Sequence, residues 1–416
     1  MIQTRYTHTA RRAVLRLVPC GIACLAIAAS ALYLTAQTTP PAQAGASPKP
    51  APKFTMPPPT PNDTLVSPEV EKDGHIIFRL YAPEAKTVRL QAEGLESTPG
   101  MTMESMMASY AGFPMEKGAD GVWIIRFGPI QPGDYRYNFL VDGVAATDPR
   151  NPAASQSLNQ VRSMYEVPGA VFMETGKDTP HGAIASIEYF SKATDGMRRM
   201  HVYTPPGYEA GSPKCPVLYL LHGGGDSDDS WPTVGRAGAI LDNLIASGKA
   251  QPMIVVMPAG HVARNFSLNG IMGHDAFNDD LIDTVVPYID SHYRTVADRN
   301  HRALAGLSMG GWQSLTVSLT RADLFAYVGI FSSGWFQESL GKEEETTLAR
   351  YKASGLTYKL FWMGAGKLDI AFANAHATET ELRKYGIEPV FHESEGFHAW
   401  NNWRDYLNLF APQLFH

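Results

Sequence analysis

The sequence is poor in cysteine and has no long run of like charge. Three of its 416 residues are cysteine, and only 18% are Asp, Glu, Lys or Arg. Nucleic-acid-binding chains usually gather basic residues into runs or patches, so this charge pattern argues against nucleic acid as a partner. The remaining composition, 44% hydrophobic, is that of a globular protein, and the length suffices for two domains.

The N-terminal segment is basic at first and then almost wholly apolar. Four arginines and no acid precede or flank the stretch LVPCGIACLAIAASALYLTAQ. This order is typical of a secretory signal peptide over residues 1–36, with cleavage between about Ala36 and Ala44. The protein is then expected to be secreted or periplasmic, without stable membrane insertion. A retained membrane anchor is the alternative, because the apolar run is long enough to span a bilayer.

Cleavage would leave an acidic chain with a single cysteine. It removes four of the 35 Lys and Arg and none of the 41 Asp and Glu, so the formal net charge goes from −6 to −10. Such a chain does not adhere to anionic polymers through charge alone. Only Cys215 survives, which excludes an internal disulfide. Its place beside Pro216, at the start of an apolar strand, predicts a buried and unreactive thiol.

Residues 37–64 and 65–168 differ in composition. The first segment is rich in Pro, Ala and Thr and predicts an extended linker that buries no core. The second alternates apolar and polar residues, as in HIIFRLYAPEAKTVRL, and has turn signals such as Asp142-Gly143, so it predicts an all-β domain. A methionine-rich insertion, residues 100–116, has no clear period and predicts a loop.

The β domain resembles the sandwich modules that precede glycogen-branching enzymes, debranching enzymes and many secreted bacterial esterases. The likeness rests on FRLYAPEAKTVRL and DGVWIIRFGPIQPGDYRYNFLVDGV. It implies an immunoglobulin-like sandwich of a kind often classed as carbohydrate-binding. The residues themselves favour packing over sugar binding, because Tyr135, Tyr137 and Phe139 fall on one face at period two.

Residues 180–416 alternate strand-like and helix-like segments. CPVLYLLHGGG and QPMIVVMPAG are apolar enough for buried strands, and residues 275–293 carry apolar residues at helical spacing. Residues 398–415 predict a closing helix. This alternation predicts an α/β fold, with a mostly parallel sheet covered by helices on both faces.

One short stretch of this region, LAGLSMGGWQS, carries the pattern Gly-x-Ser-x-Gly. A strand precedes Ser308 and a helix follows it, which is the setting of a nucleophile elbow. Gly306 and Gly310 would let two backbone segments approach while Ser308 takes an exposed, strained conformation. Ser308 is therefore the predicted nucleophile.

A serine nucleophile needs a base and a third group that orients the base. His398 follows the last predicted strand in a loop, whereas His392 falls inside that strand and His376 on a helix. Asp369 lies in the loop after a strand, the usual place for functional side chains in such sheets. We therefore predict a triad of Ser308, His398 and Asp369, with helix capping as the alternative role of Asp369.

A glycine loop, LHGGGD, ends an earlier apolar strand. Such a loop can aim backbone N–H groups at a developing oxyanion, and we assign this role to the N–H groups of Gly224 and Met309. His222 is expected to brace the loop. Neither a metal nor another cofactor is expected. The acids that follow the loop fit no calcium-binding spacing and predict a solvated turn; they are Asp226, Asp228 and Asp229.

Together these motifs resemble the esterase D-type family. The likeness covers residues 180–416 and rests on LHGGGDSDDSW, LAGLSMGGWQS, GAGKLD and GFHAWNNWRDYLNLFAPQLF. The family holds feruloyl and acetylxylan esterases, enterochelin esterases and mycolyl transferases. The resemblance implies an α/β-hydrolase domain, here preceded by the all-β sandwich, with the three triad residues named above.

The function expected from this resemblance is that of an exported serine carboxylesterase. Export, the linker and the sandwich favour feruloyl or acetyl esters of hemicellulose, either as small esters or linked to the polysaccharide. Three alternatives stay open: a siderophore esterase, an acyltransferase to a sugar, and a non-catalytic carbohydrate-binding protein. The acidic chain argues against an anionic siderophore, and the intact triad argues against a dead enzyme.

Three tryptophans lie in loops near the predicted site. Trp231, Trp335 and Trp400 are candidates for an acyl pocket, and ordinary packing is the alternative for each. Trp403, one turn after Trp400, is expected in the core. Activity is expected to rise with pH as His398 loses its proton, because only the neutral imidazole can accept the serine proton.

Overall fold

The computed structural model describes residues 55–95, 111–211, 213–262, 275–336 and 342–416. The predicted signal peptide, most of the predicted linker and most of the methionine-rich insertion lie outside the described residues. The described residues from Pro58 to His416 belong to one compact unit. No helix of the described part is long and apolar enough to cross a bilayer.

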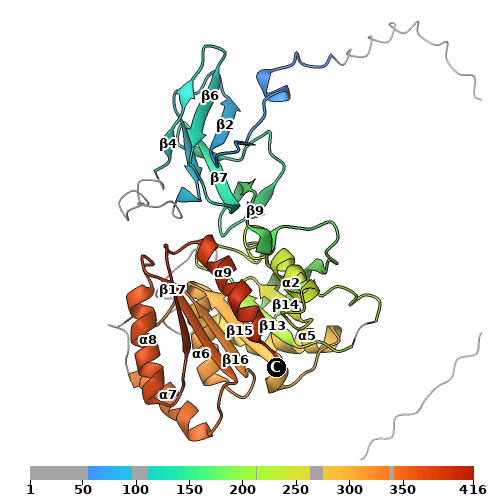
Figure 1. The fold of residues 1–416 in the computed structure, drawn as a ribbon, viewed down its shortest axis with the longest axis vertical. Coiled ribbons are helices and arrows are strands. Elements are labelled where there is room, and N and C mark those ends of the chain that lie inside the picture. The colour runs from blue at the N-terminus through green and yellow to red at the C-terminus, as the bar shows by residue number, and fades with distance from the viewer. Residues whose placement is uncertain (1–54, 96–110, 212, 263–274, 337–341) are drawn as a thin grey trace, which may run out of the picture. The chain divides into compact units, whose positions relative to one another are not determined.

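The region predicted to be all-β forms two antiparallel sheets, as its alternating pattern predicts (Figure 1). One sheet has the strand order β1-β2-β6-β5 and the other β4-β3-β7-β10-β9, with β8 paired to β7. The strands are β1 (Glu69–Val70), β2 (Ile76–Tyr81), β3 (Val88–Ala92), β4 (Phe113–Pro114), β5 (Glu116–Lys117), β6 (Val122–Phe127), β7 (Gly133–Val141), β8 (Val144–Ala146), β9 (Ala154–Gln156) and β10 (Val161–Val167). A 3₁₀ turn, η1 (Pro61–Asp63), lies in the segment expected to be linker.

The aromatic row of β7 lies in the core of this sandwich. Tyr135, Tyr137 and Phe139 are fully buried, and the ring centroid of Phe78 from the facing sheet is 4.6 Å from that of Tyr137. Trp123 is also buried and donates its indole N–H to a backbone carbonyl. Side chains that fill a core cannot stack on a sugar, so packing is the role of these aromatic residues.

The C-terminal domain is built on one sheet with the strand order β11-β12-β14-β13-β15-β16-β17-β18. The first three strands of this order pair antiparallel and the strands from β14 onward pair in parallel, so the predicted, mostly parallel sheet is confirmed. The strands are β11 (Ala183–Ser191), β12 (Gly196–Thr204), β13 (Val217–Leu221), β14 (Ile254–Pro258), β15 (Arg302–Leu307), β16 (Tyr327–Phe331), β17 (Leu360–Gly366) and β18 (Val390–Ser394).

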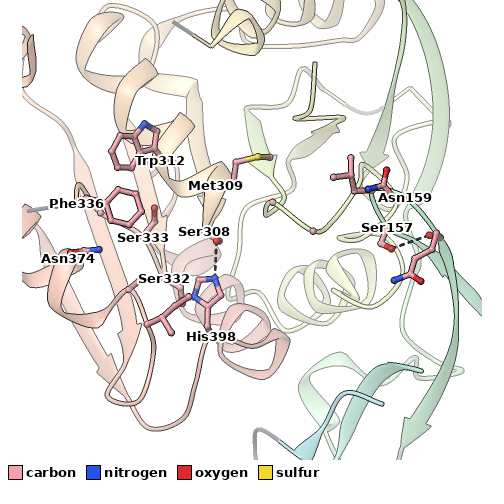
Figure 2. A pocket seen from close by; sticks show the side chains of 17 residues that line it. Ser157, Asn159, Ser308, Met309, Trp312, Ser332, Ser333, Phe336, Asn374 and His398 are labelled. Carbon is pink, nitrogen blue, oxygen red and sulfur yellow. Dashed lines mark hydrogen bonds between the residues drawn. The ribbon is translucent and has the colours of Figure 1, made fainter. Parts of the chain in front are cut away.

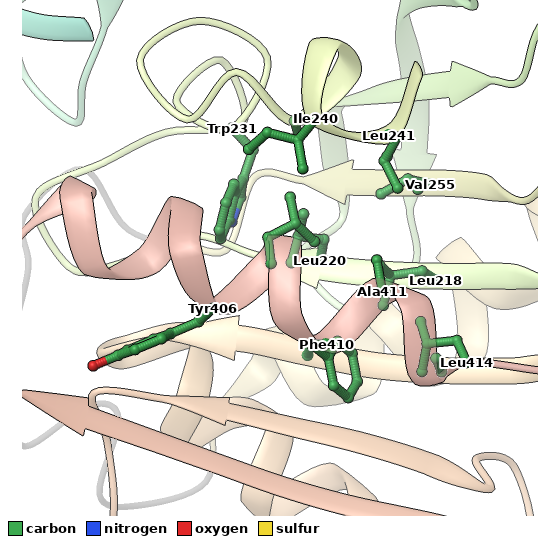
Figure 3. Close-up of a cluster of buried hydrophobic side chains, with 14 of the residues drawn as sticks. Leu218, Leu220, Trp231, Ile240, Leu241, Val255, Tyr406, Phe410, Ala411 and Leu414 are labelled. Atoms are coloured by element: carbon green, nitrogen blue, oxygen red, sulfur yellow. The ribbon is translucent and has the colours of Figure 1, made fainter. Parts of the chain in front are cut away.

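Helices cover both faces of this sheet because both faces are apolar. Along β13, Leu218 and Leu220 point into one hydrophobic cluster, and Val217 and Tyr219 point into another. In the first cluster, Phe410 and its neighbours pack the last helix against the strands (Figure 3). The helices are α2 (Ala237–Ala246), α4 (Ala276–Asp280), α5 (Val286–His292), α6 (Met309–Thr320), α7 (Lys342–Ser354), α8 (Phe372–Lys384) and α9 (Trp400–Phe410). The shorter segments are the 3₁₀ turns η3 (Val171–Met173), η5 (Arg299–His301) and η7 (Ala411–Gln413), and a π turn, η4 (Leu281–Val285), that joins α4 to α5.

Two buried arginines join the sandwich to the C-terminal domain. Arg136, in β7, donates to the Asp226 carboxylate and to the Ser230 hydroxyl, each at 2.7 Å. Arg404, in α9, donates to the backbone carbonyls of Asp134 and Val234 at 2.7 and 2.9 Å. The two domains therefore share an interface that contains buried, hydrogen-bonded polar groups.

The acids after the glycine loop correct one of the predictions. Asp226 and Asp228 are 6% and 4% exposed, so they are buried rather than solvated. Asp226 pairs with Arg136, and the Asp228 carboxylate lies 2.6 Å from Nε of Arg199 in β12. The prediction of a solvated turn is wrong for these two residues because their cationic partners come from strands far away in the sequence.

Candidate active site

Ser308 stands in a sharp turn between β15 and α6. Its backbone has φ 50° and ψ −115°, a region that residues with a Cβ avoid because of steric strain. The glycines predicted to make room do so: a Cβ on Gly310 would lie 2.6 Å from the carbonyl oxygen of His222 and 2.7 Å from the Leu221 Cβ. The local sequence therefore forces Ser308 out of the line of the strand.

The structure brings the three predicted triad residues together in one hydrogen-bonded row. His398 Nε2 lies 2.9 Å from Ser308 Oγ, and His398 Nδ1 lies 2.8 Å from Asp369 Oδ1 (Figure 2 shows the first of these contacts). The three side chains follow β15, β17 and β18, whose carboxyl ends meet at one edge of the sheet. This geometry suits proton transfer between a hydroxyl and an imidazole that a carboxylate orients.

The Asp369 carboxylate is buried and ionised. Burial raises its pKa, but the hydrogen bond from His398 and the attraction to that ring act in the opposite direction, helped by the Ser332 hydroxyl and the Ala371 N–H, so the pKa lies below its usual range. The Ala371 N–H, just before α8, also donates to Oδ1 at 2.8 Å. The N-cap position of α8 is Ala371, so Asp369 contacts the backbone just before the helix and does not cap it, and its carboxylate also holds His398.

The glycine loop is held from behind by two histidines. His222 is buried, its Nε2 accepts the Gly260 N–H at 2.8 Å, and its Nδ1 lies 2.8 Å from the Gly223 carbonyl oxygen. The first contact places the proton of the neutral ring on Nδ1, which then donates to Gly223. Burial lowers the pKa of His222, and it lowers the pKa of the neighbouring His261 to about 4. Both rings are therefore neutral supports of the loop near pH 7.

The two residues assigned to the oxyanion site flank Ser308. Gly224 and Met309 line the same cavity as Ser308 and His398. Met309 is the first residue of α6, and the first N–H groups of a helix have no acceptor within it and carry its positive dipole end. The position of these residues is consistent with donors to an oxyanion, and that role stays a prediction.

A cavity of about 690 Å³ opens on one side of Ser308, and we call it the aromatic cavity. Its apolar lining includes Trp312, Phe336 and Ile370, and the ring centroids of Trp312 and Phe336 are 5.5 Å apart. Figure 2 shows these two rings on one side of Ser308 and the polar residue Asn159 on the other. The aromatic cavity can hold an apolar group much larger than a methyl.

A second cavity, of about 390 Å³, also reaches Ser308 and His398, and we call it the interdomain cavity. Its remaining lining comes from both domains, and most of its sandwich residues are polar. This lining includes Glu93, Arg136, Gln160 and Arg162 from the sandwich, and Trp400 and Trp403 from α9.

The tryptophan predictions are wrong for two of three residues. Trp231 is 1% exposed and donates its indole N–H to the Leu221 carbonyl at 3.0 Å, so it is a core residue. Trp335 is 3% exposed and belongs to the hydrophobic cluster under α6 and α7. Trp400 and Trp403 both border the interdomain cavity, but they are 5% and 6% exposed and belong to the core cluster, so the core prediction for Trp403 is confirmed.

The apolar residues that line the aromatic cavity were not among the predicted site residues. Trp312 lies one helical turn after Ser308, and that spacing is a signal that could have identified it. Phe336 and the sandwich residues at the site have no comparable local signal. As for metal sites, one group of three possible ligands occurs within the described ranges, Glu71 with Asp73 and His75 in the sandwich.

Comparison with known proteins agrees with this architecture. The endo-1,4-beta-xylanase/feruloyl esterase of Xylanibacter ruminicola is 33% identical over 358 residues, 84% of this chain and 46% of that protein. The endo-1,4-beta-xylanase Y of Acetivibrio thermocellus is 26% identical over 250 residues, 53% of this chain and 22% of that protein. The chain thus spans less than half the length of these two relatives.

Solved structures of esterases share the fold. A ferulic acid esterase of Anaeromyces mucronatus, in complex with ferulic acid, is 28% identical with a TM-score of 0.53, over 59% of this chain and 96% of that chain. The enterobactin esterase of Shigella flexneri, at 17% identity and a TM-score of 0.57, covers 82% of this chain and 93% of its own. A family model described as "Putative esterase" matches residues 191–414, more than half of the chain. With an α/β-hydrolase fold and this match, the chain belongs to the putative esterase family.

Proposed function

We propose that this protein is an exported serine carboxylesterase that releases feruloyl groups from hemicellulose. The observation that carries the proposal is the hydrogen-bonded row from Asp369 through His398 to Ser308, which ends in the aromatic cavity. A hydroxyl activated in this way attacks carbonyl carbons, and an apolar cavity beside it holds the acyl group. The relatives named as feruloyl esterases support the same substrate class.

The proposed reaction has two halves. His398 takes the proton of Ser308 as its oxygen bonds to the ester carbonyl carbon, and the N–H groups of Gly224 and Met309 receive the negative oxygen. The C–O bond to the alcohol then breaks, His398 returns the proton to the leaving oxygen, and the acyl group stays on Ser308. Water repeats the sequence, releasing the acid and restoring the serine. Asp369 keeps the imidazole in the tautomer with the proton on Nδ1.

Size and lining favour an aromatic acyl group over acetyl. The aromatic cavity has a volume of about 690 Å³, in the range of sites for drug-sized ligands, and an acetyl group would leave most of it empty. Trp312 and Phe336 offer ring faces and edges for stacking on a phenyl ring. A feruloyl group presents such a ring.

An anionic siderophore fits the described site less well. The arginines of the interdomain cavity are Arg136 and Arg162, and each pairs with a carboxylate, of Asp226 and of Glu93 respectively. These pairs compensate the charges that would attract an anionic substrate. The likeness to the enterobactin esterase is one of fold. Cleavage of a siderophore by this protein is one of the outcomes that the test below distinguishes.

A panel of esters tests the proposal. The purified protein is expected to hydrolyse methyl ferulate and to release ferulate from feruloylated arabinoxylan, with little acetate from acetylated xylan. Ser308→Ala is expected to reduce kcat by about 10⁴-fold or more, whereas Ser291→Ala, an exposed serine near the end of α5, retains activity.

Other product patterns would overturn parts of the proposal. Cleavage of a macrocyclic triester siderophore, seen by mass spectrometry, without cleavage of either ferulate would make the protein a siderophore esterase. Ferulate appearing on an added sugar acceptor, in place of free ferulate, would make it an acyltransferase. Unchanged hydrolysis in Ser308→Ala would overturn the assignment of the site.

A further inference from the structure

One loop of the sandwich reaches the candidate active site. Residues 157–160 connect β9 to β10, and they line the aromatic cavity together with Ser308 and His398. The Leu158 N–H donates to the carbonyl of Gly225, in the glycine loop, at 3.2 Å. The sandwich therefore forms part of the wall around the nucleophile.

Hydrogen bonds hold this loop within its turn and at its β9 end. The Ser157 N–H donates to the Gln160 carbonyl at 2.9 Å and closes the turn. At its base, the Gln156 N–H donates to the Asp229 carboxylate at 2.7 Å, and the Ser227 hydroxyl donates to the Gln156 carbonyl at 3.1 Å. A wall fixed in this way to the segment after the glycine loop is suited to recognition, because little order has to be gained on binding.

The polar groups behind this loop match hydroxyl groups. Arg162 and Glu93 form an ion pair whose side chains are 17% and 23% exposed, so both still reach the space of the interdomain cavity. Gln160 lines the same cavity and accepts a hydrogen bond from Asn138 at 3.1 Å. A guanidinium donates, a carboxylate accepts, and an amide does both, which is the mixture that a polyhydroxylated, uncharged molecule requires.

The ester itself has to divide between the two cavities. Its carbonyl carbon must lie at Ser308, so the acyl group and the alcohol leave that point in different directions. Trp312 and Phe336 make the aromatic cavity suitable for the acyl group, and the interdomain cavity is then left for the alcohol.

We propose that the sandwich is the alcohol-binding half of the active site, in which Arg162, Glu93 and Gln160 hold the sugar to which the acyl group is esterified. This inference rests on the proposed function above. It gives the sandwich a role different from that of a remote carbohydrate-binding module, because its residues contact the sugar of the bond being cleaved. Specificity for the alcohol is thus set by a domain that holds none of the triad.

Two substrates with the same acyl group and different alcohols test the inference. We would measure kcat and KM for methyl ferulate and for an arabinoxylan oligosaccharide that carries one feruloyl ester. In Arg162→Met, the ratio of kcat/KM for the oligosaccharide to that for methyl ferulate is expected to fall by about ten-fold or more, mainly through a higher KM. Gln160→Ala, which leaves the ion pair intact, is expected to lower the same ratio.

The matched control is Arg126→Met, because Arg126 is also a sandwich arginine paired with a glutamate, Glu71, and lines neither cavity. It is expected to keep the wild-type ratio. A ratio that stays at the wild-type value in both Arg162→Met and Gln160→Ala would overturn the inference, whether or not overall activity drops. Wild-type protein that cleaves neither ferulate would instead overturn the proposed function, and the inference with it.

Discussion

The guanidinium of Arg136 lies 2.7 Å from the carboxylate of Asp226, and the two side chains are only 3% and 9% exposed. This contact joins β7 of the sandwich to the segment that directly follows the glycine loop. A buried ion pair adds little net stability compared with an apolar pair, but removing one partner leaves the other charge buried without compensation.

Arg136→Met is therefore expected to be strongly destabilising. The loss should be about 3–5 kcal/mol in the free energy of unfolding, measured by urea titration, because the buried Asp226 carboxyl is left without its cationic partner. The control Arg79→Met removes a half-buried sandwich arginine whose partner, Glu69, is exposed, and it is expected to change stability by less than about 1 kcal/mol. Equal losses in the two variants would contradict the structural role of the buried pair.

Asp369→Asn tests the carboxylate of the triad. An amide can offer its N–H₂ to Nδ1 and so favour the wrong tautomer of His398, and kcat is expected to fall by about 10⁴-fold with the fold retained. Asp323→Asn, at an exposed ion pair with Arg321, should leave kcat within about two-fold of wild type. Residual activity above about a tenth of wild type in Asp369→Asn would assign the orienting role to another group.

The pH dependence of kcat/KM tests His398 as the base. Activity is expected to rise with pH, since the imidazole must be neutral to accept the serine proton. The pKa of Asp369 lies below its usual range, so that carboxylate is already ionised near neutral pH and adds no second rise there. A flat profile measured with methyl ferulate would exclude His398 as the base.

Gly310→Ala tests the turn around Ser308. The added Cβ would meet the backbone of His222 at 2.6 Å, and backbone cannot rotate away as a side chain can. We expect a loss of about 1–3 kcal/mol in stability and a larger relative loss of activity, because the elbow and the glycine loop are pushed apart. Gly196→Ala is the matched control, with its nearest neighbour at 3.8 Å. Thermal unfolding and kcat of both variants provide the comparison.

Asp228 makes stability depend on pH in the acid range. Burial raises its pKa, but hydrogen bonds from His201 and Arg199 outweigh this and lower the pKa from 3.8 to about 2. The lowered pKa of Asp228 stabilises the folded protein fully at pH values above about 4, the pKa of this carboxyl in the unfolded chain. This contribution to the free energy of unfolding amounts to about 2 kcal/mol, and it is lost as pH falls from about 4 to about 2.

The corresponding measurement compares wild type with Asp228→Asn. The difference in their free energies of unfolding should shrink as pH falls through this window, since protonation removes from the wild type what the variant already lacks. Asp178→Asn, at a side chain 88% exposed, should differ from wild type by a small amount that does not change with pH. A constant difference between wild type and Asp228→Asn would show that the ion pair is not linked to the titration.

The sequence predicts well what short-range patterns determine. The apolar runs predict the parallel strands, Gly306 and Gly310 predict the elbow, and chain order alone places Asp369 and His398 after neighbouring strands. The triad geometry agrees with these predictions because the ends of adjacent parallel strands must meet.

Contacts between distant segments could not be predicted in the same way. The sequence around Asp226 predicts a solvated turn. Its partner Arg136 is 90 residues away in another domain, so no local pattern indicates that Asp226 is buried. Trp231 and Trp335 lie near the site in sequence, but their burial depends on which helix faces them. The alternation of apolar and polar residues predicts a sandwich, but it does not indicate which part of the C-terminal domain the sandwich loops contact.

The buried position of Arg404 has a consequence for how the molecule melts. Its guanidinium donates to the sandwich at Asp134, to the segment before α2 at Val234, and to Asn401 within its own helix. If the sandwich unfolded alone, this cation would lose an acceptor while most of the domain around it stayed dry. Heating should therefore produce one calorimetric peak for both domains, with a van't Hoff enthalpy equal to the calorimetric enthalpy.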